Sequence, residues 1–186
     1  MHDQDTTPRV NIVSGLASVG AAQPRVLVLG SMPGVASLTA QRYYAHPRNV
    51  FWRIAAEVFG FDAELPYDER LAQLAAHGVA LWDVLATCER SGSLDSAISR
   101  ATAQVNDFVT YFADHPQVSH VCLNGAAAAD LYERRVLPAL PDSLRQRLSS
   151  FRLPSTSPAN AAVSYPAKLA AWREALLPLP HDHRHG

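Results

Sequence analysis

The sequence has little of what marks a secreted or metal-binding chain. It contains only two cysteines, Cys88 and Cys122, which lie far apart in separate apolar runs. This spacing excludes both the disulfide framework of a small secreted domain and the clustered cysteines of a metal knuckle. We expect both thiols to be reduced and structural.

The chain also lacks long hydrophobic runs and an excess of one charge. No run approaches the length of a membrane span, and the polar, acidic N-terminus, MHDQDTTPRV, has no apolar signal core. We therefore expect a cytoplasmic protein without a membrane partner. The formal net charge of −1 excludes a uniformly basic surface, so any contact with nucleic acid must be a local patch.

Length and composition predict one domain. The 186 residues are 48% hydrophobic and 18% charged, which is enough for one core and too little for a second domain. We expect a flexible segment over 1–20, a single domain over 21–178 and a tail over 179–186. The tail histidines His181, His183 and His185 could bind a metal incidentally, but we assign them no role. We expect a monomer, although the residues carry no direct signal of oligomeric state.

Apolar runs alternate with helical patterns along the chain. Four segments predict strands, 25–29, 79–82, 118–123 and 150–153, and three of them are the continuous apolar runs typical of buried parallel strands. Five segments predict helices, 50–59, 68–77, 101–115, 126–135 and 165–177. This alternation indicates an α/β fold with helices on both faces of a parallel sheet. Ligands bind such sheets beyond the carboxyl ends of the strands, where loops begin at Gly30, Asp83, Asn124 and Pro154.

The loop after the first strand is the most informative stretch, GSMPGVASLTAQRYYAHPRNVFW over 30–52. Its glycines let the backbone turn sharply and approach a ligand. Twelve residues further on, aromatic rings, cations and an amide gather, a mixture that could stack on a base, hold a phosphate and orient a water. We expect Tyr44 to stack on a ligand, whereas Phe51 and Trp52 are expected in the core. Asn49 precedes an apolar helix and is first of all a candidate N-cap, a role that does not exclude catalysis.

The other strand ends carry weaker signals. Asp83 could make turn bonds, or it could accept hydrogen bonds from a base edge. Asn124 is expected to cap the helix that follows it. Ser155, Thr156 and Ser157 form a polar linker whose hydroxyls and N–H groups could bind a phosphate.

Five motifs, in order over about 130 residues, make the chain resemble the uracil-DNA glycosylase superfamily, and within it the hypoxanthine-DNA glycosylase branch. They are GSMPG (30–34), YYAHPRNVFW (43–52), LWDVL with CER (81–85 and 88–90), NG (124–125) and PSTSPAN (154–160). The resemblance implies a three-layer α/β/α sandwich around a short, four-stranded, mostly parallel sheet. It implies no metal and no organic cofactor. It also implies removal of a deaminated base from double- or single-stranded DNA, leaving an abasic site.

The chain departs from uracil-acting relatives at two places. Met32 stands where they carry Asp or Asn, and a thioether can neither hold a water well nor act as a base. In the hypoxanthine-acting branch that duty falls to the asparagine of the His-Pro-Arg-Asn segment, here Asn49. Ser155 lies near the place where many relatives carry a histidine that supports the leaving base.

The residue patterns and the resemblance together give each candidate site residue an expected role. Asn49 would be the catalytic residue that positions water for attack on a cation-like sugar. The base would be bound by Gly30, Ser31, Met32, Tyr44 and Asp83. The DNA backbone or the leaving base would be supported by His46, Arg48, Ser155, Thr156, Ser157 and Asn160. The base would be flipped out of the duplex, and the backbone N–H groups of 30–34 would stabilise it as it leaves.

Three other interpretations stay open from the sequence. One is a glycosylase that prefers uracil or another deaminated base. Another is a non-catalytic module that binds damaged DNA, which the absence of a polar residue at Met32 favours. The third is a small hydrolase of free nucleosides, although the chain has no Gly-x-Ser-x-Gly elbow and no paired carboxylates near the first loop.

Overall fold

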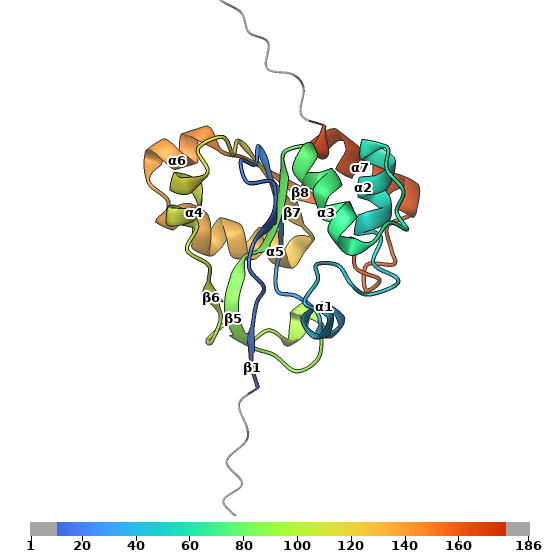
Figure 1. Cartoon of the computed structure of the whole chain (residues 1–186). Helices are drawn as coiled ribbons and strands as arrows, with labels where there is room; N and C mark the ends of the chain where they lie inside the picture. Colours follow the sequence, from blue (N-terminus) through green and yellow to red (C-terminus); the bar gives the residue numbers. More distant parts are fainter. Residues whose placement is uncertain (1–10, 178–186) are drawn as a thin grey trace, which may run out of the picture.

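A computed structural model describes residues 11–177 of the chain (Figure 1). The expected tail over 179–186, with His181, His183 and His185, lies outside the described residues. Within 11–177, no helix is both long and apolar enough to cross a bilayer, and no group of three His, Cys, Asp or Glu side chains is placed to hold a metal ion. Cys88 and Cys122 are free and buried.

A five-stranded sheet forms the centre of the molecule, in the order β2-β4-β3-β7-β8. Its strands are β2 (Val19–Gly20), β3 (Val26–Gly30), β4 (Val79–Asp83), β7 (His120–Asn124) and β8 (Ser149–Leu153). The last four are parallel and correspond to the four predicted strands, whereas β2 pairs antiparallel with β4. The expectation of four strands is therefore corrected to five. The sequence hides β2 because it is only two residues long and one of them is a glycine.

Helices cover both faces of this sheet, so the three-layer α/β/α architecture is confirmed (Figure 1). One face packs against α2 (Phe51–Phe59), α3 (Tyr67–Ala76) and α7 (Tyr165–Leu176), and the other against α4 (Phe108–Asp114), α5 (Ala126–Leu131) and α6 (Asp142–Arg147). Alternate residues of β3 supply the two cores: Val26 and Val28 pack into the first, Leu27 and Leu29 into the second.

Two predicted helices are shorter than the sequence indicated. The helix expected over 101–115 is α4 alone, because Asp107 caps it by accepting a hydrogen bond from the Thr110 backbone N–H (3.1 Å). The helix expected over 126–135 is divided in the structure. It consists of α5, then a short π-helix, η2 (Tyr132–Val136), and a 3₁₀ helix, η3 (Leu137–Ala139), follows. Neither α1 (Val35–Ala40) nor α6 was predicted.

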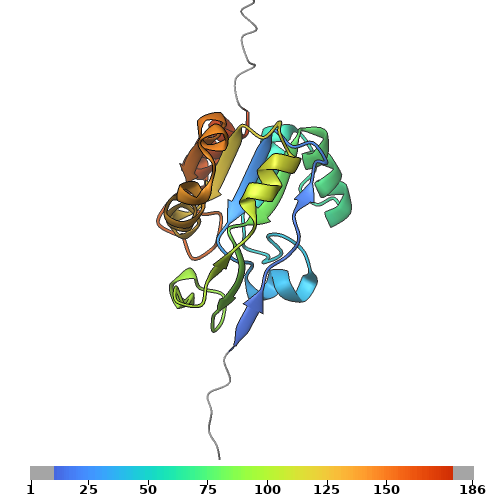
Figure 2. The ribbon, with the colours of Figure 1, turned by 90° about the vertical axis from the view of Figure 1, so that its left-hand side faces the viewer.

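A second, three-stranded sheet was also not predicted. It consists of β1 (Ile12–Ser14), β5 (Leu85–Glu89) and β6 (Gln104–Val105), all antiparallel. Strand β5 follows β4 directly, and both views place this sheet and α1 at one end of the molecule (Figures 1 and 2). After β5 the chain makes a short 3₁₀ turn, η1 (Asp95–Ala97). The described part of the segment 1–20, which we expected to be flexible, contributes β1 and β2.

Candidate active site

A cavity of about 910 Å³ opens at the carboxyl ends of the parallel strands. Its lining comes from the loops that follow β3, β4, β7 and β8 and from the segment before α2. The structure brings all twelve predicted site residues to this one cavity: Gly30, Ser31, Met32, Tyr44, His46, Arg48, Asn49, Asp83, Ser155, Thr156, Ser157 and Asn160. The convergence follows from the parallel topology, because parallel strands end at the same edge of the sheet.

Gly30 and Asp83 form the floor of the cavity. They are register partners at the ends of β3 and β4, and the Gly30 carbonyl accepts a hydrogen bond from the Val84 N–H (2.8 Å). A Cβ atom on residue 30 would overlap the Asp83 Oδ1 atom, so only glycine leaves room for this carboxyl group. Glycine at position 30 therefore serves close approach rather than an unusual backbone angle.

The Asp83 side chain is buried, with 4% of its surface exposed. Its Oδ2 atom is buried and has no hydrogen-bond partner among the described residues. Burial is the main cause that raises the pKa of Asp83 to about 7; the negative charge of Asp95 adds to the rise and the positive charge of Arg90 opposes it. Asp83 is thus poised to change its charge near neutral pH.

Ser31 and Met32 continue the floor in different ways. The Ser31 hydroxyl donates a hydrogen bond to the Asp95 carboxylate. The Met32 side chain packs in a small apolar cluster with Leu85, Cys88 and Ala103. No described residue accepts a hydrogen bond from the backbone N–H of Ser31 or Met32. These two N–H groups are therefore free to donate to a ligand.

Arg90 lies under this loop, a position that the sequence did not reveal. It is 1% exposed, and its guanidinium donates to the carbonyl groups of Met32 (3.5 Å) and Pro33. A buried cation that holds two carbonyls fixes the loop from below and places positive charge beneath the cavity. The sequence offered Arg90 only as part of a motif, without a role.

The Tyr44 ring packs against the core residue Phe51, and its hydroxyl lies near Gly30 on the floor of the cavity. Its ring centroid lies 4.2 Å from that of Phe51, and its backbone has a left-handed conformation with φ 55°. The hydroxyl is buried and makes no hydrogen bond of ordinary geometry with a described residue. Burial and the nearby Asp83 raise the pKa of Tyr44, while the Asn124 amide offsets part of the rise. Phe51 and Trp52 are buried core residues, as predicted.

Asn49 lies half-buried at the wall of the cavity, just before α2. Its Oδ1 atom accepts a hydrogen bond from the Phe51 N–H (2.9 Å), two residues further on. The expectation that Asn49 is the N-cap is nevertheless wrong, because the cap position of α2 is Val50 and no side chain caps the helix. A carbonyl oxygen has a second lone pair, and the Nδ2 donor makes no hydrogen bond within the described chain. The amide is therefore held in one orientation and still has an acceptor and donors for a water.

Asn124 and Thr156 join the two loops behind Asn49. Asn124 Nδ2 donates to the Thr156 hydroxyl (2.9 Å), and the Thr156 N–H donates to Asn124 Oδ1 (3.0 Å). The expectation that Asn124 caps α5 is wrong, because the cap position is Gly125 and no side chain caps it. The Thr156 carbonyl in turn accepts from the Val50 N–H (3.1 Å), which ties the loop after β8 to the start of α2.

The rest of the loop after β8 is held by its own polar groups. Ser155 Oγ accepts from the Ser157 N–H, and Ser157 Oγ accepts from the Ala159 N–H, both at 3.2 Å. Asn160 Nδ2 donates to the Ser155 carbonyl (3.2 Å), and the buried Lys168 ammonium donates to the Asn160 carbonyl (2.8 Å). This loop is therefore preformed.

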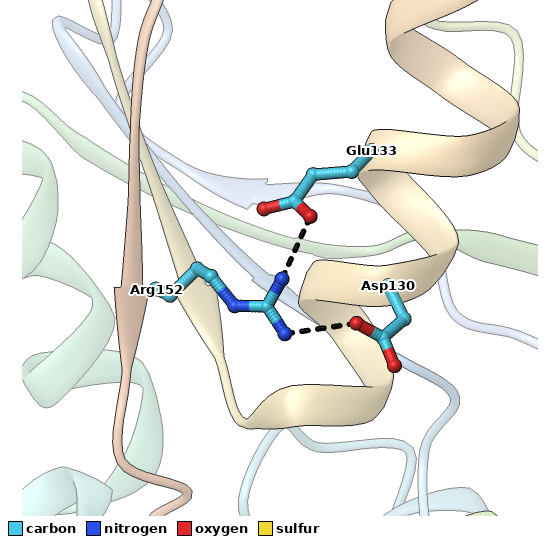
Figure 3. Close-up of polar contacts among 3 residues, drawn as sticks. All are labelled: Asp130, Glu133 and Arg152. Carbon is cyan, nitrogen blue, oxygen red and sulfur yellow. Dashed lines mark hydrogen bonds and ion pairs between the residues drawn. The ribbon is translucent and has the colours of Figure 1, made fainter.

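Three basic residues, His46, Arg48 and Arg152, lie at the edge of the cavity. His46 and Arg48 are exposed, and His46 Nδ1 accepts from the Arg48 N–H (3.1 Å). Arg152, which the sequence did not indicate, donates to Asp130 Oδ1 (2.8 Å) and Glu133 Oε2 (2.7 Å), so that α5 and η2 fix its guanidinium (Figure 3). The hydrogen bond from Arg152 lowers the pKa of Asp130.

The sequence analysis also did not indicate Ser93 and Asp95, which line the cavity. In the sequence their segment has only the pattern of a polar turn.

Comparisons with known proteins agree with this arrangement. Residues 17–178 match the family model described as the uracil DNA glycosylase superfamily. The chain is 32% identical over 137 residues to a hypoxanthine DNA glycosylase of Methanosarcina acetivorans, covering 69% of this chain and 85% of that protein. It is 31% identical over 134 residues to a hypoxanthine DNA glycosylase of Methanosarcina barkeri, covering 67% and 84%.

A solved structure gives the same result. The solution NMR structure of a candidate uracil DNA glycosylase from Methanosarcina acetivorans superposes with a TM-score of 0.74 at 30% identity, covering 89% of this chain and 96% of that chain. Family model, relatives and structure agree with the resemblance carried by the five motifs. The chain therefore belongs to the uracil DNA glycosylase superfamily.

Proposed function

We propose that this protein is a monofunctional DNA glycosylase that hydrolyses the N-glycosidic bond of a deaminated base flipped out of DNA, with hypoxanthine from deoxyinosine as the main substrate. Two relatives that carry the name hypoxanthine DNA glycosylase support this proposal. The observation that carries it is the convergence of Gly30, Tyr44 and Asn49 on one cavity, whose volume of about 910 Å³ suits a nucleotide.

Flipping sets the first energetic requirement. Extruding a base costs a few kcal/mol, and less when the base is mispaired. Stacking on Tyr44 would return roughly 1–3 kcal/mol, a similar amount, so stacking alone does not decide which base is held. Selection then rests on hydrogen bonds to the base edge, for which Asp83 and the free N–H groups of Ser31 and Met32 are available.

The chemical step needs a placed water and a stabilised leaving base. As the bond between C1′ and the base breaks, positive charge grows on the sugar and negative charge on the base. The Ser31 and Met32 N–H groups, with the Arg90 cation beneath them, stabilise the negative charge. Asn49 holds the water beside the sugar. An amide does not ionise, so its contribution is positioning.

The outer residues contact the DNA backbone. His46 and Arg48 meet phosphates on one side of the cavity, and the loop of Ser155, Ser157 and Asn160 meets them on another. Thr156 is 1% exposed, so it does not contact the DNA itself. It supports the site through its hydrogen bonds with Asn124. The protein acts as a monomer in the cytoplasm, where it has access to DNA, and accepts lesions in double or single strands.

A second function is favoured by one observation. Because the Met32 side chain lies in an apolar cluster, the first loop carries no polar side chain that could hold a water at that position. A protein that binds damaged DNA without cutting the glycosidic bond would show the same feature. Tight binding to a deoxyinosine duplex without any abasic product would favour that function.

The test incubates the purified full chain with duplexes that contain deoxyinosine, deoxyuridine or deoxyxanthosine. Free base is measured by chromatography and abasic sites by alkaline cleavage. We expect the largest release from deoxyinosine. Preferential release of uracil would replace the proposed substrate, and turnover of free inosine in place of DNA would indicate a nucleoside hydrolase.

A further inference from the structure

We propose that Asp83 reads the flipped base as a neutral carboxylic acid, donating one hydrogen bond and accepting another along the adjacent C=O and N–H of a lactam edge. This inference rests on the proposed function and deepens it. It names the chemical feature of the base that the cavity recognises. It also predicts how that recognition changes with pH.

The surroundings of Asp83 do not stabilise a carboxylate. The side chain is 4% exposed, Oδ2 has no hydrogen-bond partner among the described residues, and Oδ1 faces the Cα of Gly30. The polar contact from Asn106 goes to the backbone carbonyl of Asp83 (2.8 Å) and leaves the carboxyl group untouched. A buried carboxylate without donors is costly, so this site favours the protonated form until a ligand arrives.

Charged and titratable groups near Asp83 act on its carboxyl group in opposite directions. Asp95, on the turn after β5, repels a negative charge on Asp83, whereas Arg90, directly after β5, attracts one. Arg90, however, donates hydrogen bonds to the Met32 and Pro33 carbonyls rather than to Asp83. Tyr43 and Tyr44 lie close enough for Asp83 to raise their pKa values, which keeps both neutral. The Tyr43 hydroxyl donates to the Leu16 and Ala17 carbonyls rather than to Asp83. Burial and Asp95 together keep the proton on Asp83 up to about neutral pH.

A carboxylic acid matches the edge of hypoxanthine. The base presents the O6 acceptor beside the N1–H donor, and a neutral carboxyl group presents one O–H donor beside one C=O acceptor. An ionised carboxylate has only acceptors, so it would pair with N1–H and repel O6. Uracil carries the same pair of groups at O4 and N3–H, which predicts some activity on that base.

The same form suits the breaking of the glycosidic bond. The electron pair of the bond leaves with the base, so negative charge develops on O6 while the proton stays on Asp83. A neutral O–H donor stabilises this charge, whereas a carboxylate in a buried site would oppose it. The neutral acid is therefore favoured in the transition state as well as in binding.

The experiment compares wild type with Asp83→Asn, because an amide keeps a donor and an acceptor at every pH. Single-turnover release of hypoxanthine from a deoxyinosine duplex is measured from pH 5.5 to 9. We expect the wild-type rate to fall about tenfold per pH unit once Asp83 ionises, and the fall of Asp83→Asn to begin at least about one unit higher. Asp68→Asn, an exposed change on α3, should follow the wild type.

Two results would overturn the inference. One is an Asp83→Asn protein that keeps the wild-type circular dichroism and melting temperature but releases no base at any pH. The other is an Asp83→Asn profile whose fall coincides with that of the wild type. In either case, release by the wild type would leave the proposed function intact.

A second readout does not depend on activity. Infrared difference spectra between wild type and Asp83→Asn should show the carbonyl band of a protonated carboxyl group at pH 6, lost at pH 9. Absence of that band at pH 6 contradicts the inference. If the band is present but the wild type releases no base at any pH, the proposed function fails while the protonation state of Asp83 is upheld.

Discussion

Asn124 and Thr156 exchange two hydrogen bonds, from Nδ2 to the hydroxyl (2.9 Å) and from the backbone N–H to Oδ1 (3.0 Å). The pair connects the ends of β7 and β8, and the Thr156 carbonyl extends the connection to Val50 beside Asn49. Thr156 is 1% exposed, so these bonds are shielded from water. The position of Asn49 therefore depends on a contact between two loops that are 32 residues apart in the chain.

We expect the Asn124 and Thr156 side chains to be energetically coupled. Asn124→Ala removes both hydrogen bonds and leaves buried groups unpaired, which should lower the free energy of unfolding by about 1–3 kcal/mol. Thr156→Val removes only the hydroxyl. Urea unfolding of both variants and the double variant should give a coupling of about 0.5–3 kcal/mol. Strict additivity would show that the pair does not act as a unit.

Gly30→Ala should disable the site without unfolding the protein. The new Cβ would overlap the Asp83 carboxyl group and displace it from the floor of the cavity. A misplacement of that order costs about 100-fold in rate. In the same loop, a Cβ at Gly34 would meet only Ser93, at 3.5 Å or more. Gly34→Ala should therefore lose much less base release, and equal losses would contradict this account of the floor.

The ring of Tyr44 should matter more than its hydroxyl. Tyr44→Ala removes the proposed stacking surface, worth roughly 1–3 kcal/mol per base. Tyr44→Phe keeps the ring and deletes a hydroxyl that has no hydrogen-bond partner of ordinary geometry. Binding to duplexes that carry a non-cleavable deoxyinosine analogue should weaken strongly for the first variant and slightly for the second. The reverse order would assign the binding to the hydroxyl.

Asp83 should also make stability depend on pH. The pKa of its carboxyl group rises from 3.8 to about 7 on folding, so between these values the folded state holds a proton that the unfolded chain has lost. Stability therefore falls as pH rises from about 4 to about 7. Relative to Asp83→Asn, the loss is at most about 4 kcal/mol. Urea midpoints at pH 4.5, 6 and 7.5 check this, and parallel curves for the two proteins would refute it.

The sequence predicts the central sheet well because buried parallel strands are continuous apolar runs. Val26 and Leu27 pack on opposite faces, so the run itself indicates helices on both sides. The second sheet escapes prediction because its strands are two to five residues long and pair between distant segments, such as Ile12 with Glu89. Asp107 could have predicted the start of α4, because aspartate is a common N-cap and its side chain accepts a hydrogen bond from the Thr110 N–H.

The twelve predicted site residues line one cavity because loops at parallel strand ends meet in one place. The sequence did not predict the contacts that shape this cavity. Asn124 looks like a helix cap in the sequence, yet its amide reaches across to Thr156. Arg90 and Asp95 reach the first loop only because β5 folds beneath it, and no local pattern encodes that approach.

The most direct test of the account is the release of free hypoxanthine from a deoxyinosine duplex by wild type, Asn49→Ala and Asn49→Asp. The Asn49 amide lies in the same cavity as Ser31 and Tyr44 and is oriented by the Phe51 N–H. We predict release by the wild type, a loss of about 100-fold or more in Asn49→Ala, and partial recovery in Asn49→Asp, which keeps the acceptor. Unchanged release by folded Asn49→Ala, or no release by the wild type, would contradict the account.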